Sequence, residues 1–106
     1  MDERQFEARA GEALRSIERA LDQSGVDADF ELKEGGVLEL EFRNGSKIIV
    51  NRHGAAREIW VAARSGGFHF RWDGAAWRDT RDGAELFAAL SKLVSAQSGT
   101  GVILAA

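Results

Sequence analysis

The stretch Asn44-Gly45-Ser46-Lys47-Ile48-Ile49-Val50-Asn51-Arg52 decides the fold of this 106-residue chain. Asn-Gly is a strong signal for a type I′ turn, which needs positive φ at both central residues, so the flanking segments are predicted to pair as antiparallel strands. Side chains alternate across a strand, which places Asn51 on the face opposite Val50. In the following strand Ile59 is expected to point inward, so Trp60 shares the outward face with Asn51.

The whole chain, including this hairpin, is predicted to form a helix, six short strands and a second helix. Apolar residues recur at helical spacing over residues 3–23 and again over residues 85–96, whereas alternating segments separated by glycine turns mark the strands. We predict an α+β fold, a two-layer α/β sandwich. Its antiparallel sheet of about six strands is covered on one face by an N-terminal and a C-terminal helix, in one domain over residues 1–106.

Several local features refine this expectation. Asp2 is predicted to cap the first helix with Gln5 in a capping box, and Asp82 to cap the second with Glu85. The apolar tail Val102-Ile103-Leu104 is expected to pack against the helices. Leu86, Leu90, Leu93 and Val94 are predicted to form the buried stripe of the second helix, and Trp72 and Trp77 to pack in the core or its turns.

Composition excludes several classes of protein. The chain has no cysteine, so it has neither disulfides nor thiolate metal sites, and a reducing cytoplasmic setting is expected. Residues 1–23 are charged throughout and no apolar run is long enough for a bilayer, so we expect no signal peptide and no membrane segment. The acidic pI of about 5.4 argues against a nucleic-acid partner.

Acidic residues are concentrated in the first part of the chain. Residues 1–41 carry twelve acidic and five basic residues, which points to a basic partner, a cation, or both. Asp27, Asp29 and Glu31 are predicted to share one face of a strand, while Glu18 and Asp22 lie four residues apart on the first helix. Such an acidic edge can hold Fe²⁺, Ca²⁺, Mn²⁺ or Mg²⁺ weakly, although a solvated charged face is the alternative reading.

No catalytic motif is present. An EF-hand loop starting at Asp27 fails, because Leu32 and Leu38 stand where glycine and glutamate are needed. His53 and His69 lie on different predicted strands without metal-ligand spacing, so both are expected to be ordinary surface histidines. No nucleophile elbow or phosphate loop is found.

The order of motifs resembles bacterial frataxin over nearly the whole chain. The resemblance rests on Asn44 to Arg52, Ile59-Trp60, Gly66-Gly67-Phe68-His69-Phe70, and Trp72-Asp73-Gly74 with Trp77. It implies an iron-binding adaptor and regulator of iron–sulfur cluster assembly that docks on a cysteine desulfurase and its scaffold protein. It also implies a monomer that forms oligomers in the presence of iron, with Fe²⁺ or Fe³⁺ held weakly on surface carboxylates.

The resemblance assigns roles to individual residues. Iron would bind at Glu18, Asp22, Asp27, Asp29 and Glu31, and the partner at Trp60 and Asn51 together with Glu18 and Asp22. Trp60 is then an exposed docking anchor whose loss should leave stability little changed. Glu58 departs from the family pattern, because some relatives have an amide there. Two alternatives remain: an iron oxidase or iron-storage protein acting at the acidic residues, and an interaction module without a metal role.

Overall fold

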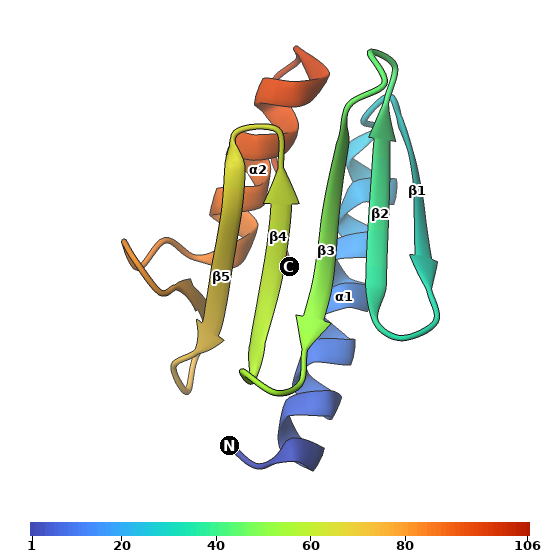
Figure 1. Cartoon of the computed structure of the whole chain (residues 1–106). Coiled ribbons are helices and arrows are strands. Elements are labelled where there is room, and N and C mark those ends of the chain that lie inside the picture. The colour runs from blue at the N-terminus through green and yellow to red at the C-terminus, as the bar shows by residue number, and fades with distance from the viewer.

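The computed structural model describes all 106 residues, as one six-stranded sheet with two helices behind it (Figure 1). Every neighbouring strand pair is antiparallel, and the order in the sheet is the order along the chain. The predicted α+β two-layer fold is therefore confirmed. The elements are α1 (Glu3–Ser24), β1 (Ala28–Lys33), β2 (Val37–Phe42), β3 (Lys47–His53), β4 (Glu58–Ala63), β5 (Gly66–Trp72), β6 (Trp77–Asp79) and α2 (Leu86–Ser98).

The hydrophobic core lies between the sheet and the helices. Helix α1 packs behind β1, β2 and β3, and α2 lies behind the β4–β5 side (Figure 1). Apolar side chains at helical spacing on α1 meet the inward residues of the strands, with Phe6, Leu14, Ile48, Val50 and Phe70 among those fully buried. The opposite face of the sheet carries no helix (Figure 1). Neither helix is long and apolar enough to cross a membrane.

The turn between β2 and β3 differs in type from the prediction. Gly45 has a φ of 83°, but Asn44 does not adopt positive φ, so the turn is not type I′. Instead the Gly45 N–H donates to the Phe42 carbonyl at 2.9 Å, and the Asn44 side chain accepts from the Ser46 N–H at 2.9 Å. A turn through residues 43–44 followed by a left-handed glycine is the usual three-residue hairpin loop. The predicted faces of β3 are unaffected, because Ile48 and Val50 are buried.

Helix α2 begins later than predicted. Its N-cap is Glu85, whose carboxylate accepts the N–H groups of Phe87 at 2.8 Å and Ala88 at 3.1 Å. Asp82 instead accepts the N–H of Ala84 within the preceding turn. The reason is that residues 84–85 bond alongside β6, where the Asp79 N–H donates to the Ala84 carbonyl at 2.8 Å, and this holds them out of the helix. The capping box of Asp2 and Gln5 on α1 is confirmed.

The C-terminal tail packs against α2 as predicted, except at one residue. Val102 and Leu104 are buried, but Ile103 points outward and is 86% exposed. The hydroxyl groups of Ser95 and Ser91 accept the N–H groups of Val102 and Leu104 at 2.8 Å each, which aligns the tail along the helix. Of the stripe predicted for α2, Leu86, Leu90 and Val94 are fully buried, whereas Leu93 is only partly buried.

One buried amide joins α2 to the sheet. The Gln97 side chain accepts the Arg64 N–H at 2.9 Å and donates to Ser46 Oγ at 3.0 Å and to the Lys47 carbonyl at 3.2 Å. The Asn44 side chain donates to the Gln97 carbonyl at 2.9 Å. These bonds tie the end of α2 to the β2–β3 and β4–β5 turns.

Candidate functional site

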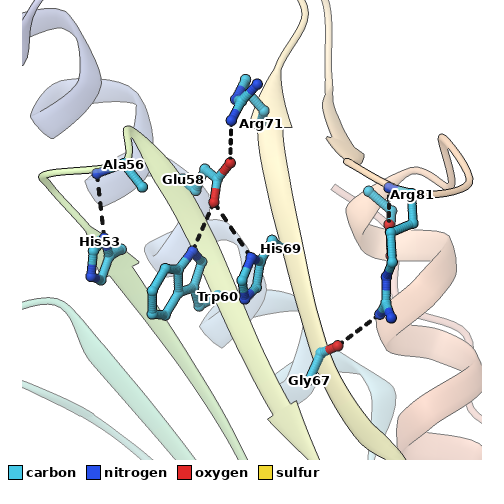
Figure 2. A network of polar contacts seen from close by, with 9 residues as sticks. His53, Ala56, Glu58, Trp60, Gly67, His69, Arg71 and Arg81 are labelled. Atoms are coloured by element: carbon cyan, nitrogen blue, oxygen red, sulfur yellow. Dashed lines mark hydrogen bonds and ion pairs between the residues drawn. The ribbon is translucent and has the colours of Figure 1, made fainter.

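Trp60 lies on the open face of the sheet, in a cross-strand row with Asn51 of β3 and His69 of β5. The shared outward face of Trp60 and Asn51 was therefore predicted correctly. The indole is not freely exposed, however. It is half-buried between two imidazoles that stack on its two sides: His53 at a centroid distance of 3.7 Å and an interplanar angle of 9°, and His69 at 4.4 Å and 8° (Figure 2). Trp60 thus presents the edge of its ring to solvent rather than a bare face.

Glu58 fixes the orientation of this indole. Its carboxylate accepts the Trp60 Nε1–H at 2.9 Å and a guanidinium N–H of Arg71 at 2.5 Å, and His69 Nδ1 lies 3.6 Å away (Figure 2). Glu58 is only 5% exposed. Burial alone would raise the pKa of Glu58, but the hydrogen bonds from Trp60 and Arg71 and the charges of Arg71 and His69 outweigh it, so the pKa lies below its ordinary value.

Glu58 was missed as a site residue by sequence reasoning, although a signal was present. It stands two residues before Trp60 in the same strand, and residues at this spacing share a face. The sequence could not show that Trp60 and Arg71 both donate to its carboxylate and that His69 lies beside it.

Asn51 contains the one buried side-chain polar atom without a hydrogen-bond partner, its Oδ1. A buried acceptor without a donor costs about 1–3 kcal/mol. The unpaired Asn51 oxygen lies beside Trp60. A residue with only a packing role at this position would have an apolar side chain or a hydrogen-bonded polar one.

The predicted metal ligands are spread over two layers. Asp29 and Glu31 project from β1 on the open face, whereas Glu18 and Asp22 belong to α1 behind the sheet. Asp27 precedes β1 and forms an exposed ion pair with Arg43 at 2.9 Å. Nowhere do three or more His, Asp or Glu side chains come close enough together to hold a metal ion.

The structure adds two carboxylates that the sequence analysis did not single out. Glu41 lies directly opposite Asp29, and Glu39 directly opposite Glu31. Side chains opposite one another in an antiparallel pair have Cβ atoms about 4.5–5.5 Å apart, so each row places two like charges close together, which destabilises the sheet. Lys33 and Lys47 offset part of this charge through Glu39, at 3.5 and 3.6 Å. The β1–β2 end of the open face is therefore acidic.

Another hollow lies away from these residues. It occupies about 300 Å³ between α1 and β5–β6, beside Trp72 and Trp77, with the Arg9 guanidinium 4.4 Å from the centre of the Trp72 ring. Trp77 is buried and Trp72 half-buried, as expected for core packing. No unpaired buried polar side chain lines this hollow, so its size alone does not make it the candidate site.

Comparison with known proteins identifies relatives along the whole chain. The model of the frataxin-like domain family matches residues 1–100. The iron-sulfur cluster assembly protein CyaY of Dechloromonas aromatica is 62% identical over 104 residues, covering 98% of this chain and 99% of that protein. The protein of the same name from Cupriavidus pinatubonensis is 54% identical over 101 residues, covering 92% and 91%.

Solved structures agree with these matches. Frataxin from Psychromonas ingrahamii superposes with a TM-score of 0.91 at 31% identity, and the match covers 100% of both chains. Trimeric frataxin from the yeast Saccharomyces cerevisiae, solved in complex with ferrous iron, superposes with a TM-score of 0.67 at 24% identity over 94% of this chain and 88% of the yeast chain. The yeast match supports the shared fold alone.

Proposed function

This chain belongs to the frataxin family, and from that premise we propose that it is an adaptor of iron–sulfur cluster assembly. In this proposal it works in the cytoplasm, binds iron weakly on surface carboxylates, and docks on the complex of a cysteine desulfurase and its scaffold protein. Relatives named as iron-sulfur cluster assembly proteins support the general role. The identity of the docking partner and the binding of iron are the more specific parts of the proposal.

The observation that carries the docking proposal is the constrained indole on the open face. Trp60 is stacked between two histidines and hydrogen-bonded by buried Glu58, so its conformation is set before a partner arrives. Preorganised aromatic side chains near the centre of a surface supply much of the binding energy of protein interfaces. The unpaired acceptor of Asn51 beside it is a cost that a docking role explains.

Iron, as cargo, would bind at the acidic end of the sheet. Carboxylate oxygens are hard ligands suited to Fe²⁺ and to other divalent cations, and the opposed pair of Asp29 and Glu41 offers oxygens from two strands. Asp27 and Glu31 add negative charge on the β1 side, and Glu18 and Asp22 add it from α1 behind the sheet. Because no three ligands converge, each iron would keep much of its water, and binding should be weak.

An adaptor fits this arrangement better than an iron oxidase. Di-iron oxidase sites hold their metals with Glu and His side chains that project inward from a helical bundle. Here the carboxylates lie on a sheet surface and on a separate helix, and the two histidines flank Trp60. We therefore propose that any oxidation of Fe²⁺ is stoichiometric, and that the free protein is a monomer that associates further when iron is bound.

Binding kinetics test the docking part. The parent protein, Trp60→Ala and a control, Ile103→Ala, are passed over the immobilised desulfurase–scaffold complex of the same organism under reducing conditions. Ile103 is an exposed apolar residue in the C-terminal tail, away from the open face. We expect Trp60→Ala to weaken binding by roughly 2 kcal/mol or more, about thirty-fold, and Ile103→Ala to have no effect. Equal affinities for all three proteins would refute a docking role for the indole.

Amide spectra test the iron part. Fe²⁺ added under anaerobic conditions should broaden the signals of Glu18, Asp22, Asp27, Asp29 and Glu31 while residues 64–71 stay sharp. A diamagnetic divalent surrogate should shift the same group of signals. Uniform broadening of both regions would show that iron has no localised site on this protein.

A further inference from the structure

A polar hollow opens beside the Trp60 stack, at the β5–β6 end of the open face. It occupies about 260 Å³ and is lined by Gly67, His69, Thr80 and Arg81, with no apolar residue. His69 forms one wall and also stacks on Trp60 at 4.4 Å. A group that enters this hollow therefore contacts His69, which in turn stacks on the indole.

Arg81 is held in place without an acidic partner. Its guanidinium donates to the Gly67 carbonyl at 2.8 Å (Figure 2). It also lies 5.5 Å from the centre of the Phe68 ring. Arginine has five N–H donors, so most of them remain free. The arginines that form ion pairs within the chain are Arg43, Arg52, Arg71 and Arg78. The positive charge of Arg81 is thus fixed but not neutralised.

The acidic groups closest in sequence to Arg81 are already engaged with the backbone. Asp79 is buried and its carboxylate accepts the Arg81 backbone N–H at 2.7 Å, while Asp82 accepts the Ala84 N–H at 2.9 Å. Arg71 and Arg78 are paired with Glu58 and Asp73 respectively. Arg81 therefore has no competing carboxylate within ion-pair distance.

We propose that this hollow receives a carboxylate side chain of the docked partner protein, bound by the Arg81 guanidinium with His69 at its side. Guanidinium groups bind carboxylates through two parallel N–H···O bonds, and Arg81 loses little freedom on binding because Gly67 and Phe68 already hold it. The inference deepens the proposed docking function and rests on it.

The charge distribution explains why the occupant is a protein carboxylate. The open face is acidic on β1–β2, through Asp29, Glu31 and Glu41, and offers a free cation beside His69 at its β5–β6 end. A partner that contacts both ends must present basic groups over the first and an acidic group over the second. Opposite charges at the two ends fix the orientation of docking, since a partner turned by half a revolution would meet like charges at both.

Binding of the desulfurase–scaffold complex tests this with four variants: Arg81→Ala, Arg81→Lys, Trp60→Ala and the control Arg64→Ala. Arg64 is an exposed arginine that forms no ion pair and does not line the hollow. We expect Arg81→Ala to weaken binding about ten-fold, Arg81→Lys to recover only part of the loss because lysine lacks the planar fork, and Arg64→Ala to bind like the parent. Thermal denaturation of each variant shows whether loss of the Arg81–Phe68 contact has unfolded it. If Arg81→Ala is unfolded, the binding of Arg81→Lys is compared with that of the parent instead.

The outcomes separate the two proposals. If the parent binds and Trp60→Ala weakens binding, but the Arg81 variants match Arg64→Ala, the hollow has no role and only this inference is overturned. If the parent does not bind the complex, the proposed function and this inference both fail. A side-chain NMR titration of the free protein with acetate and with inorganic phosphate adds a third arm. Tight phosphate binding at Arg81 that acetate cannot match would make the hollow a small-anion site and overturn the inference.

Discussion

Replacing Trp60 by alanine should cost stability as well as binding, which revises the expectation for a freely exposed anchor. The ring makes two stacked aromatic contacts, at 3.7 and 4.4 Å, each worth about 0.5–1.5 kcal/mol. Its Nε1–H donates to the Glu58 carboxylate, which contributes about 1 kcal/mol at a half-buried position. The sum predicts that Trp60→Ala lowers the free energy of unfolding by about 2–4 kcal/mol.

Urea denaturation followed by far-UV circular dichroism measures this effect without relying on tryptophan fluorescence. Trp60→Phe is the matched control, since it keeps an aromatic ring between His53 and His69 but removes the donor to Glu58, and should cost about 1 kcal/mol. A loss below about 0.5 kcal/mol for Trp60→Ala would refute the reasoning, because the stack would then contribute nothing. Binding data for Trp60→Ala must accordingly be collected where the variant remains folded.

Three further predictions follow from other contacts. Because the pKa of Glu58 is lowered in the folded state, its carboxylate stabilises the protein at neutral pH, and that contribution is lost as pH falls below about 4 through the folded-state pKa. Glu58→Gln should therefore cost more stability at pH 7 than at pH 3, and equal losses at both pH values in urea titrations would contradict this. Asp29→Asn should raise the free energy of unfolding by about 0.5 kcal/mol by relieving repulsion across β1–β2, and should reduce the stabilisation by added divalent cations; identical cation effects in parent and variant would remove Asp29 from the site. Gly36→Ala should raise the unfolded fraction in thermal scans, because Gly36 has a φ of 77° and an added Cβ would lie 2.6 Å from the Arg52 side chain; an unchanged melting temperature would show that Arg52 moves aside without cost.

The elements of the fold could be predicted from periodicity and turns because both are local properties. Alternation in β3 and β4 placed Trp60 and Asn51 on one face correctly. Where a nonlocal contact competed with a local signal, the prediction was wrong. Asp82 has the residue type of an N-cap, but pairing of residues 84–85 with β6 moved the N-cap to Glu85.

The candidate site was less accessible to sequence reasoning, because its properties arise between strands. Strand register determines that His53 and His69 flank Trp60 and that Glu39 and Glu41 oppose the acids of β1. None of these neighbours is adjacent in sequence. The two histidines have no motif spacing, so they were expected to be ordinary surface residues, and only their common contact with the indole gives them a shared role.

The acidic residues of β1 have a second physical consequence, because β1 is the edge of the sheet. An edge strand exposes unpaired backbone N–H and C=O groups on which a strand of another molecule can add, and charged side chains oppose this addition. Asp29 and Glu31, backed by Glu39 and Glu41, make the approach of an identical edge unfavourable. Any cation that neutralises these carboxylates weakens that protection. The residues proposed to attract iron therefore also govern how readily two molecules associate through their β1 edge strands.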